Sequence, residues 1–118
     1  MKPEQLLQIN FAQWLDAKGV LYNASMAGVN LRPMVARQRK MMGAKAGFPD
    51  IFIYESTNEF CGLAIELKVN TRPTTLQLEW QAELTARGYK ALIMPKLKTF
   101  QECFDWLKKE VSEYMGWE

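Results

Sequence analysis

The chain is predicted to fold as an α/β layered domain, and two observations carry this prediction. Apolar residues recur at helical spacing at both ends of the chain and in a third segment around residue 80. Short runs rich in β-branched and aromatic residues lie between these segments and indicate strands. The expected order is helix, three strands, helix, strand and helix, which packs a sheet against flanking helices. With 118 residues and no internal repeat or flexible linker, residues 1–118 are expected to form a single domain.

The first half of the chain is expected to contain one long helix and one short strand. The helix begins at Pro3, because proline suits the first helical position, and Gly19 is a natural stop. Residues 20–25 are expected to form the strand. Residues 27–47 form a basic connection, in which residues 33–42 are expected to contain one or two helical turns.

The second half is expected to supply most of the sheet. Residues 50–56 and 62–69 are β-rich and are separated by a short polar segment, so they are expected to pair as neighbouring antiparallel strands. A helix is expected between residues 74 and 88, with a threonine cap at its start and a glycine at its end. Residues 89–95 are expected to form a strand that ends in a proline, and Thr99 is expected to cap a final amphipathic helix.

The composition excludes several kinds of site. The sequence has no histidine, so Ser-His-Asp triads, Cys-His pairs and histidine-ligated zinc cannot be formed. Cys61 and Cys103 lack metal-ligand spacing and are expected to be reduced thiols in a cytoplasmic protein. No apolar run is long enough to cross a membrane, and the polar N-terminal residues do not resemble a secretion signal. Any catalysis must therefore use carboxylates, lysine, hydroxyl groups and a hard metal ion.

Two acids and a base lie in the most strand-like part of the chain. Side chains alternate along a strand, so Glu66 and Lys68 share one face and lie about 7 Å apart along the backbone. Asp50 follows Pro49 at the start of the preceding strand, and it converges with Glu66 at one edge of the sheet if the two strands pair. Carboxylates held close repel each other, and Mg²⁺ or Mn²⁺ suits a site with oxygen ligands alone. Lys68 would then polarise an attacking water or stabilise charge on a phosphate, which is the chemistry of a metal-dependent phosphodiesterase.

Each of these residues also has an ordinary structural interpretation. Glu66 and Lys68 can form an exposed ion pair on one face of the strand, worth less than about 1 kcal/mol. Asp50 can cap a turn through its side chain.

The positive charges are concentrated in the middle of the chain, although the net charge is only +2. No acid occurs between Asp16 and Asp50, whereas the tail after residue 101 is rich in acids. The segment is either a solvated basic loop or the contact surface for a polyanion. Its basic residues are Lys18, Arg32, Arg37, Arg39, Lys40 and Lys45.

The motifs "GFPDIFI" and "IELKV" together resemble the PD-(D/E)XK nuclease superfamily, and in particular its VRR-NUC branch, the virus-type replication-repair nuclease domains. The helix "LQLEWQAELTARGYKALI" with its early glutamine and its Gly-Tyr exit is similar to that branch, as is Glu4 on the first helix. The resemblance covers about residues 4–93. It implies a restriction-endonuclease-like core, with a central mixed β-sheet flanked by helices in the order αβββαβα.

The resemblance also implies roles for individual residues. Asp50, Glu66 and the backbone carbonyl of Leu67 would be metal ligands, and Lys68 would be the catalytic lysine. Glu4 would hold a metal-bound water or a second metal; its ordinary role is an acid favoured at a helix N-terminus. Gln77 would position Lys68 or a phosphate, or it is simply a surface glutamine of the helix. The basic residues expected to follow DNA phosphates are Arg32, Arg37, Arg39, Lys40 and Lys45.

The tryptophans and the residues of the first predicted strand are given simpler interpretations. Trp80, Leu84 and the other apolar residues of the second predicted long helix are expected to lie in the core. The remaining tryptophans Trp14, Trp106 and Trp117 are expected to be packing residues rather than surfaces for base stacking. Tyr22, Asn23 and Ser25 lie near the expected site and are given no role.

The sequence therefore predicts a Mg²⁺- or Mn²⁺-dependent endonuclease that is selective for DNA structure. The family's small stand-alone members resemble Holliday-junction resolvases, which implies branched DNA as substrate and a homodimer with two active sites. The resemblance also implies the cytoplasm of a bacterium or of a phage-infected cell, with no membrane partner and no organic cofactor. The alternatives are a non-catalytic nucleic-acid-binding module, a nuclease-fold subunit of a larger complex, and an enzyme that cleaves RNA, flaps or single-strand ends.

Overall fold

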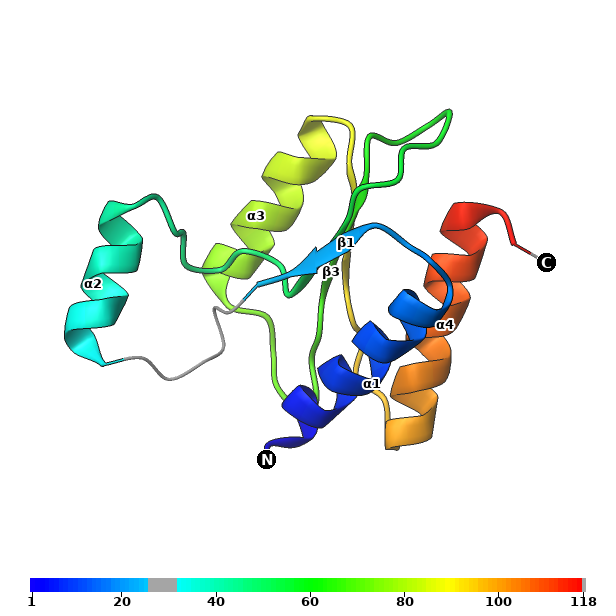
Figure 1. The fold of residues 1–118 in the computed structure, drawn as a ribbon, viewed down its shortest axis with the longest axis horizontal. Helices are drawn as coiled ribbons and strands as arrows, with labels where there is room; N and C mark the ends of the chain where they lie inside the picture. The colour runs from blue at the N-terminus through cyan, green and yellow to red at the C-terminus, as the bar shows by residue number, and fades with distance from the viewer. Residues whose placement is uncertain (26–31, 118) are drawn as a thin grey trace.

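The computed structural model describes residues 1–25 and 32–117 and has the predicted α/β architecture (Figure 1). Four helices surround a four-stranded mixed sheet, which confirms the predicted fold class. The order contains one helix more than predicted, because the turns expected within residues 33–42 form a complete helix. The elements are α1 (Pro3–Ala17), β1 (Tyr22–Ala24), α2 (Pro33–Met41), β2 (Ile51–Ile53), β3 (Leu63–Glu66), α3 (Thr75–Ala86), β4 (Lys90–Ile93) and α4 (Phe100–Met115).

The sheet has the strand order β1-β2-β3-β4. β2 pairs antiparallel with both β1 and β3, so the predicted pairing of residues 50–56 with residues 62–69 is confirmed. β3 and β4 are parallel, and α3 forms the crossover that parallel strands require. β3 is consequently a central strand, and all four of its residues are buried.

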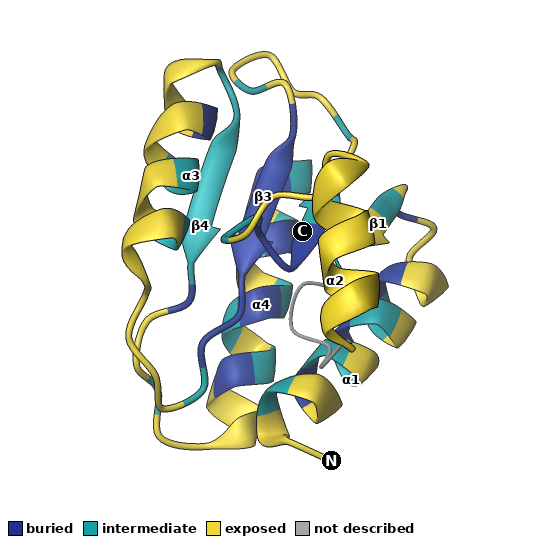
Figure 2. Ribbon diagram, turned by 90° about the vertical axis from the view of Figure 1, so that its left-hand side faces the viewer, coloured by how far each residue is buried: buried dark blue, intermediate teal, exposed yellow. Residues whose placement is uncertain are grey.

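Helices α1 and α4 cover one face of the sheet and build the main core with it. α1 places Leu7, Phe11 and Leu15 in this core, at spacings of four residues that keep them on one helix face. From the sheet, Ile51 and Ile65 lie opposite each other in adjacent strands and are fully buried. Figure 2 shows the buried residues of the helices and of β3 facing one another. Trp14, Trp106 and Trp117 pack against this core, as predicted.

Helix α3 lies on the opposite face, where the contacts are mainly aromatic. Phe52 alternates with its buried neighbours in β2 and therefore points to this side, where its ring lies 5.5 Å from that of Tyr89 and 6.4 Å from that of Phe48. Phe48 in turn packs edge-on against Trp80 of α3, with ring centroids 5.1 Å apart. Leu84 is buried as predicted and Trp80 is half-buried, but Leu76 and Leu78 are 48% and 49% exposed, so the prediction that the apolar residues of this helix lie in the core was wrong for these two.

Helix α2 stands apart from these layers (Figure 1). Every residue from 32 to 46 is exposed, and Figure 2 shows α2 exposed along its whole length. The part of the predicted basic connection at residues 26–31 lies outside the described residues. Within the described part of the chain, no helix has the length and hydropathy needed to span a membrane.

Candidate metal centre

The strand register brings Asp50 and Glu66 together at one end of the sheet. The paired residues of β2 and β3 run from Ile53 opposite Leu63 to Ile51 opposite Ile65. One further step in this antiparallel register places Asp50 opposite Glu66. Directly opposed residues in antiparallel strands have β-carbons about 5 Å apart, so their carboxyl groups meet. The two carboxyl groups share a hydrogen bond.

Backbone contacts fix Asp50 from both neighbouring strands. Its carbonyl oxygen accepts a hydrogen bond of 2.7 Å from the backbone N–H of Ser25, just beyond β1. Its carboxylate oxygen Oδ2 accepts one of 2.7 Å from the backbone N–H of Leu67, just beyond β3. Pro49 restricts the backbone immediately before it. The carboxylate of Asp50 therefore has a defined orientation before any ligand is present.

The first turn of α1 brings a third carboxylate to the same place. Oxygen atoms of Glu4, Asp50 and Glu66 all lie within 4.8 Å of one another. Glu4 is half-buried, and its carboxylate accepts a hydrogen bond from the backbone of Val69. Its location at the N-terminus of α1 also favours a negative charge.

Burial overturns the ordinary interpretation of the charged strand. Asp50, Glu66 and Lys68 are 8%, 4% and 8% exposed, so Glu66 and Lys68 are not an exposed ion pair. The side chain of Asp50 accepts its hydrogen bond from a residue 17 positions away, so it does not cap a local turn. Burying three ionisable groups together is costly unless charges compensate one another.

The raised pKa values of two carboxyl groups indicate an excess of negative charge in the site. Burial raises the pKa of Glu66 to about 10, together with the hydrogen bond that the protonated Glu66 carboxyl donates to Asp50 and with the charge of Asp50, and Lys68 offsets only part of this. Burial and the charge of Asp50 also raise the pKa of Glu4. Repulsion among these carboxylates is relieved by a proton or by a cation.

The residues present fit a divalent cation. The donors are carboxylate oxygens, which hard cations such as Mg²⁺ and Mn²⁺ prefer, and three of them come from different elements that hold them in place. The group can therefore bind a divalent metal, with Glu4, Asp50 and Glu66 as the ligands that the geometry offers.

Two other predicted site residues have contacts that bear on their roles. The Leu67 N–H binds Asp50, so this residue already supports a proposed ligand through its backbone, while its carbonyl remains a predicted ligand. The Gln77 side chain accepts a hydrogen bond of 2.9 Å from the backbone N–H of Thr74, whose hydroxyl accepts from the Gln77 N–H at 3.2 Å. Gln77 thus forms a capping box at the start of α3. Its predicted role beside Lys68 remains a prediction.

The loop before Asp50 is fixed to α3 by contacts that the sequence analysis did not identify. The indole Nε1–H of Trp80 donates a hydrogen bond of 3.0 Å to the carbonyl of Ala46. Gly47 has a φ of 82°, and a β-carbon there would lie 2.7 Å from the β-carbon of Leu76. Only glycine combines this conformation with so close an approach. The glycine two positions before Pro49 was the available signal for this contact.

The predicted DNA-contacting residues lie away from the layers of the core. Arg37, Arg39 and Lys40 belong to α2, Arg32 is its N-cap residue, and Lys45 lies in the following loop. All five are exposed. They are connected to the carboxylates through the short segment from Ala46 to Pro49.

Comparison with known proteins gives matches at the level of structure. No family profile and no curated protein match the sequence. A solved structure described as a "VRR_NUC domain protein" superposes with a TM-score of 0.74 and 25% identity, covering 98% of this chain and 90% of that one. A second, described as a "VRR_NUC domain", has a TM-score of 0.61 and 18% identity, covering 97% of this chain and 99% of that one.

Proposed function

Since the chain has the fold of VRR_NUC domain proteins over nearly its whole length, we propose that it is a metal-dependent endonuclease that cleaves branched DNA. The observation that carries the proposal is the buried group formed by Glu4, Asp50 and Glu66 with Lys68 beside it. The fold supports a nuclease in general, and the acidic group supports a divalent metal. The preference for branched DNA is the finer part of the proposal.

Each residue of the group has a defined task in this function. Asp50 and Glu66 are proposed to hold the metal, with the Leu67 carbonyl as a further ligand and Glu4 as a ligand to a bound water or a second ion. When bound, the cation supplies a Lewis acid that lowers the pKa of water and neutralises phosphate charge. Lys68 is proposed to orient the attacking water or to stabilise charge that develops on the phosphate. Gln77 is proposed to assist Lys68. To do so, the Gln77 side chain would have to release the hydrogen bond that it accepts from the Thr74 N–H.

Lys68 is well suited to this task because its surroundings are largely shielded from water. It is 8% exposed and its charge acts on both Glu66 and Glu4. An ammonium group in a site of low dielectric stabilises a developing negative charge more strongly than it would in water.

The proposed substrate follows from the exposed basic residues. Arg32, Arg37, Arg39, Lys40 and Lys45 are all exposed, and such residues bind phosphates without reading the base sequence. We therefore expect recognition of DNA shape. Symmetric cleavage of a four-way junction needs two active sites, so the working unit is proposed to be a homodimer.

The alternative function is a nucleic-acid-binding module without catalysis. The clustering of three carboxylates, two of them buried, argues against it, since clustered acids repel phosphate and contribute nothing to a simple binding surface. A binding module would bind DNA with a steep salt dependence and would not cleave it with any divalent metal.

The test compares the wild type with Asp50→Asn on a panel of DNA substrates. The wild type should cleave a four-way junction with Mg²⁺ or Mn²⁺ and cleave a linear duplex of the same sequences more slowly. Asp50→Asn keeps the size of the side chain but removes a ligand charge, so cleavage should fall by about a hundredfold or more. Isothermal titration with Mn²⁺ should show weaker metal binding by this variant.

Two results would end the proposal. One is wild-type protein that cleaves neither junctions, flaps, single strands nor RNA with any divalent metal. The other is cleavage that Asp50→Asn leaves unchanged, because activity would then come from another site or from a contaminating nuclease.

A further inference from the structure

Helix α2 has apolar side chains that remain exposed when residues 1–25 and 32–117, the part of the chain that the structure describes, are considered. Met34 and Met41 are seven residues apart and therefore lie on the same side of the helix, flanked by Val35. These side chains are 71%, 81% and 37% exposed, and Met42, just after the helix, is 87% exposed. Arg37 lies between the two methionines, three residues after Met34 and four before Met41, and Arg39 lies on the opposite side of the helix. Helices shorter than about 12–15 residues are marginal in water, so a nine-residue helix of this kind needs a surface to pack against.

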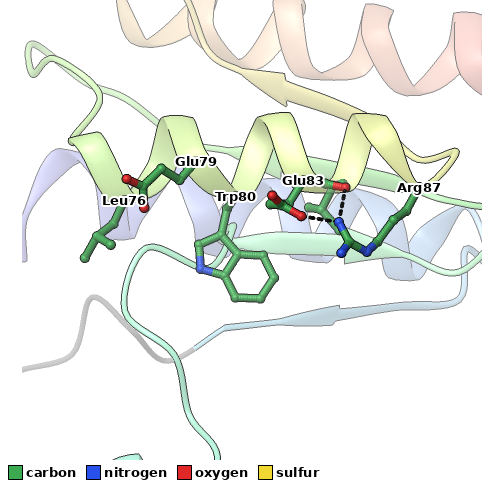
Figure 3. A pocket seen from close by; sticks show the side chains of 6 residues that line it. Leu76, Glu79, Trp80, Glu83 and Arg87 are labelled. Carbon is green, nitrogen blue, oxygen red and sulfur yellow. Dashed lines mark hydrogen bonds and ion pairs between the residues drawn. The ribbon is translucent and has the colours of Figure 1, made fainter.

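Helix α3 carries an apolar groove, large enough to take a few apolar side chains (Figure 3). Its volume is about 410 Å³, and Leu76, Trp80 and Leu84 form its floor at spacings of four residues. Leu76 is 48% exposed although it is apolar. Glu79 and Glu83 form the rim of the groove together with Arg87, which pairs with Glu83.

The charges of the helix and of the groove are complementary. Residues 17–49 contain no acid, and α2 contributes three of their basic residues. Glu79 and Glu83 are four residues apart on α3, where like charges destabilise a helix slightly. A basic amphipathic helix in this groove would bury its methionines on Leu76 and Trp80 and place cations beside the two acids.

We propose that α2 of one copy docks in the α3 groove of a second copy, and that a twofold dimer results. The chain leaving α2 is held at the groove of its own protomer by the bond from Trp80 to Ala46. Both views show α2 itself well away from its own α3 (Figures 1 and 2). Helix and groove are thus separate surfaces of one protomer, and a twofold axis between two copies satisfies both at once.

This inference rests on the dimer of the proposed function and specifies its interface. Asp50 lies four residues after Ala46, so the docked helix and the acidic group are connected through one short loop.

The experiment measures the mass of the full chain by sedimentation over a micromolar concentration range. We expect a dimer for the wild type. Met41→Glu in α2 and Leu76→Glu in the groove should each weaken it by at least about tenfold, because each buries a charge in the interface. Leu78→Glu is the matched control, since Leu78 is 49% exposed on the far side of the same helix and should leave the dimer intact.

Mixing the two weakened variants gives a second, independent readout. A mixed dimer retains one intact contact, between α2 of the Leu76→Glu protomer and the groove of the Met41→Glu protomer. The mixture should therefore dimerise more strongly than either variant alone. Circular dichroism should show that all variants are folded.

Three results would overturn the inference. They are a monomeric wild type at all concentrations, a dimer that neither Met41→Glu nor Leu76→Glu weakens, and a mixture no more dimeric than its components. These outcomes are distinct from failure of the nuclease proposal. An Asp50→Asn protein should still dimerise, and a dimer that meets the tests above without cleaving DNA would support the interface while ending the proposed activity.

Discussion

Two charged regions of this protein are held in opposite ways. The carboxylates of Asp50 and Glu66 lie at the end of the central strands, are less than a tenth exposed and are fixed by contacts from β1, β3 and α1. The basic residues of α2 lie on a helix without a single buried residue. The core thus fixes the carboxylates that are proposed to act in catalysis. The basic helix α2, proposed to contact DNA, would instead be held in place by the molecule that binds it. Substitutions in the two regions should therefore affect cleavage, stability and DNA binding to different extents.

The largest contrast is expected between a buried lysine and an exposed one. Lys68→Met should reduce cleavage of a junction by about a thousandfold, because it removes a positive charge from a site of low dielectric. Lys45→Met should reduce it by less than about tenfold, because an exposed phosphate contact is worth little by itself. Single-turnover rates at saturating protein separate this loss from weaker binding. Equal losses of cleavage in the two variants would show that Lys68 contributes only to the overall positive charge of the protein and has no specific part in the reaction.

The second contrast concerns stability. Ile65→Ala should lower the free energy of unfolding by about 2–5 kcal/mol, because Ile65 is fully buried in the central strand and leaves a cavity. Met34→Ala in α2 should change it by less than about 0.5 kcal/mol, because Met34 is 71% exposed. Urea unfolding at low protein concentration, where a dimer contributes least, gives both values. A large loss for Met34→Ala would mean that α2 packs on its own chain.

The acidic group should also oppose folding when no metal is present. The pKa of Glu66 is raised from 4.5 to about 10, so between these values the folded state binds more protons than the unfolded state. Stability of the metal-free protein should therefore fall as the pH rises through this range. Glu66→Gln removes the carboxylate while keeping its size, and should raise stability near pH 7 by about 1–3 kcal/mol.

Metal binding gives the complementary measurement for Glu66. Wild-type protein should be stabilised by Mn²⁺ in thermal unfolding, increasingly so as the pH rises, because the cation competes with the proton for this carboxylate. Glu66→Gln should lose most of this stabilisation. If the variant were less stable than wild type in the absence of metal, the repulsion inferred among the three carboxylates would be wrong.

The sequence predicted the acidic end of the sheet well because the constraints there are local and periodic. Antiparallel pairing of two short strands and the alternation of their side chains suffice to bring Asp50 opposite Glu66. Glu4 was a harder case, since nothing local connects the start of a helix to residue 66. Its position was expected from the family resemblance, and the structure places it within reach of the other two carboxylates.

The surroundings of α3 were predicted less well, for physical reasons that differ between residues. Thr74 and Gln77 have the spacing of a capping box, a local signal that was available in the sequence. The spacing of Leu76, Trp80 and Leu84 indicates an apolar side of the helix but does not tell whether the sheet covers it. In the structure Gly47 lies against Leu76 and Phe48 packs on Trp80, and the part of this side that they leave open lines the groove. The sequence analysis predicted only one or two turns for α2, because its apolar residues are exposed in the described part of the chain and give no clear helical pattern.

The smallest effect is expected from charges at the exposed region. Lys40→Ala with Lys45→Ala should weaken binding of catalytically inactive Asp50→Asn protein to a junction by about tenfold at low salt. The slope of the logarithm of affinity against the logarithm of salt concentration should fall by about 2, because each lost phosphate contact releases about one counterion fewer. Lys96→Ala with Lys98→Ala removes the same charge from exposed positions before α4, and should leave the slope nearly unchanged. Equal changes for the two pairs would show that DNA responds to the net charge of the protein, and the basic helix would then have no special part in recognition.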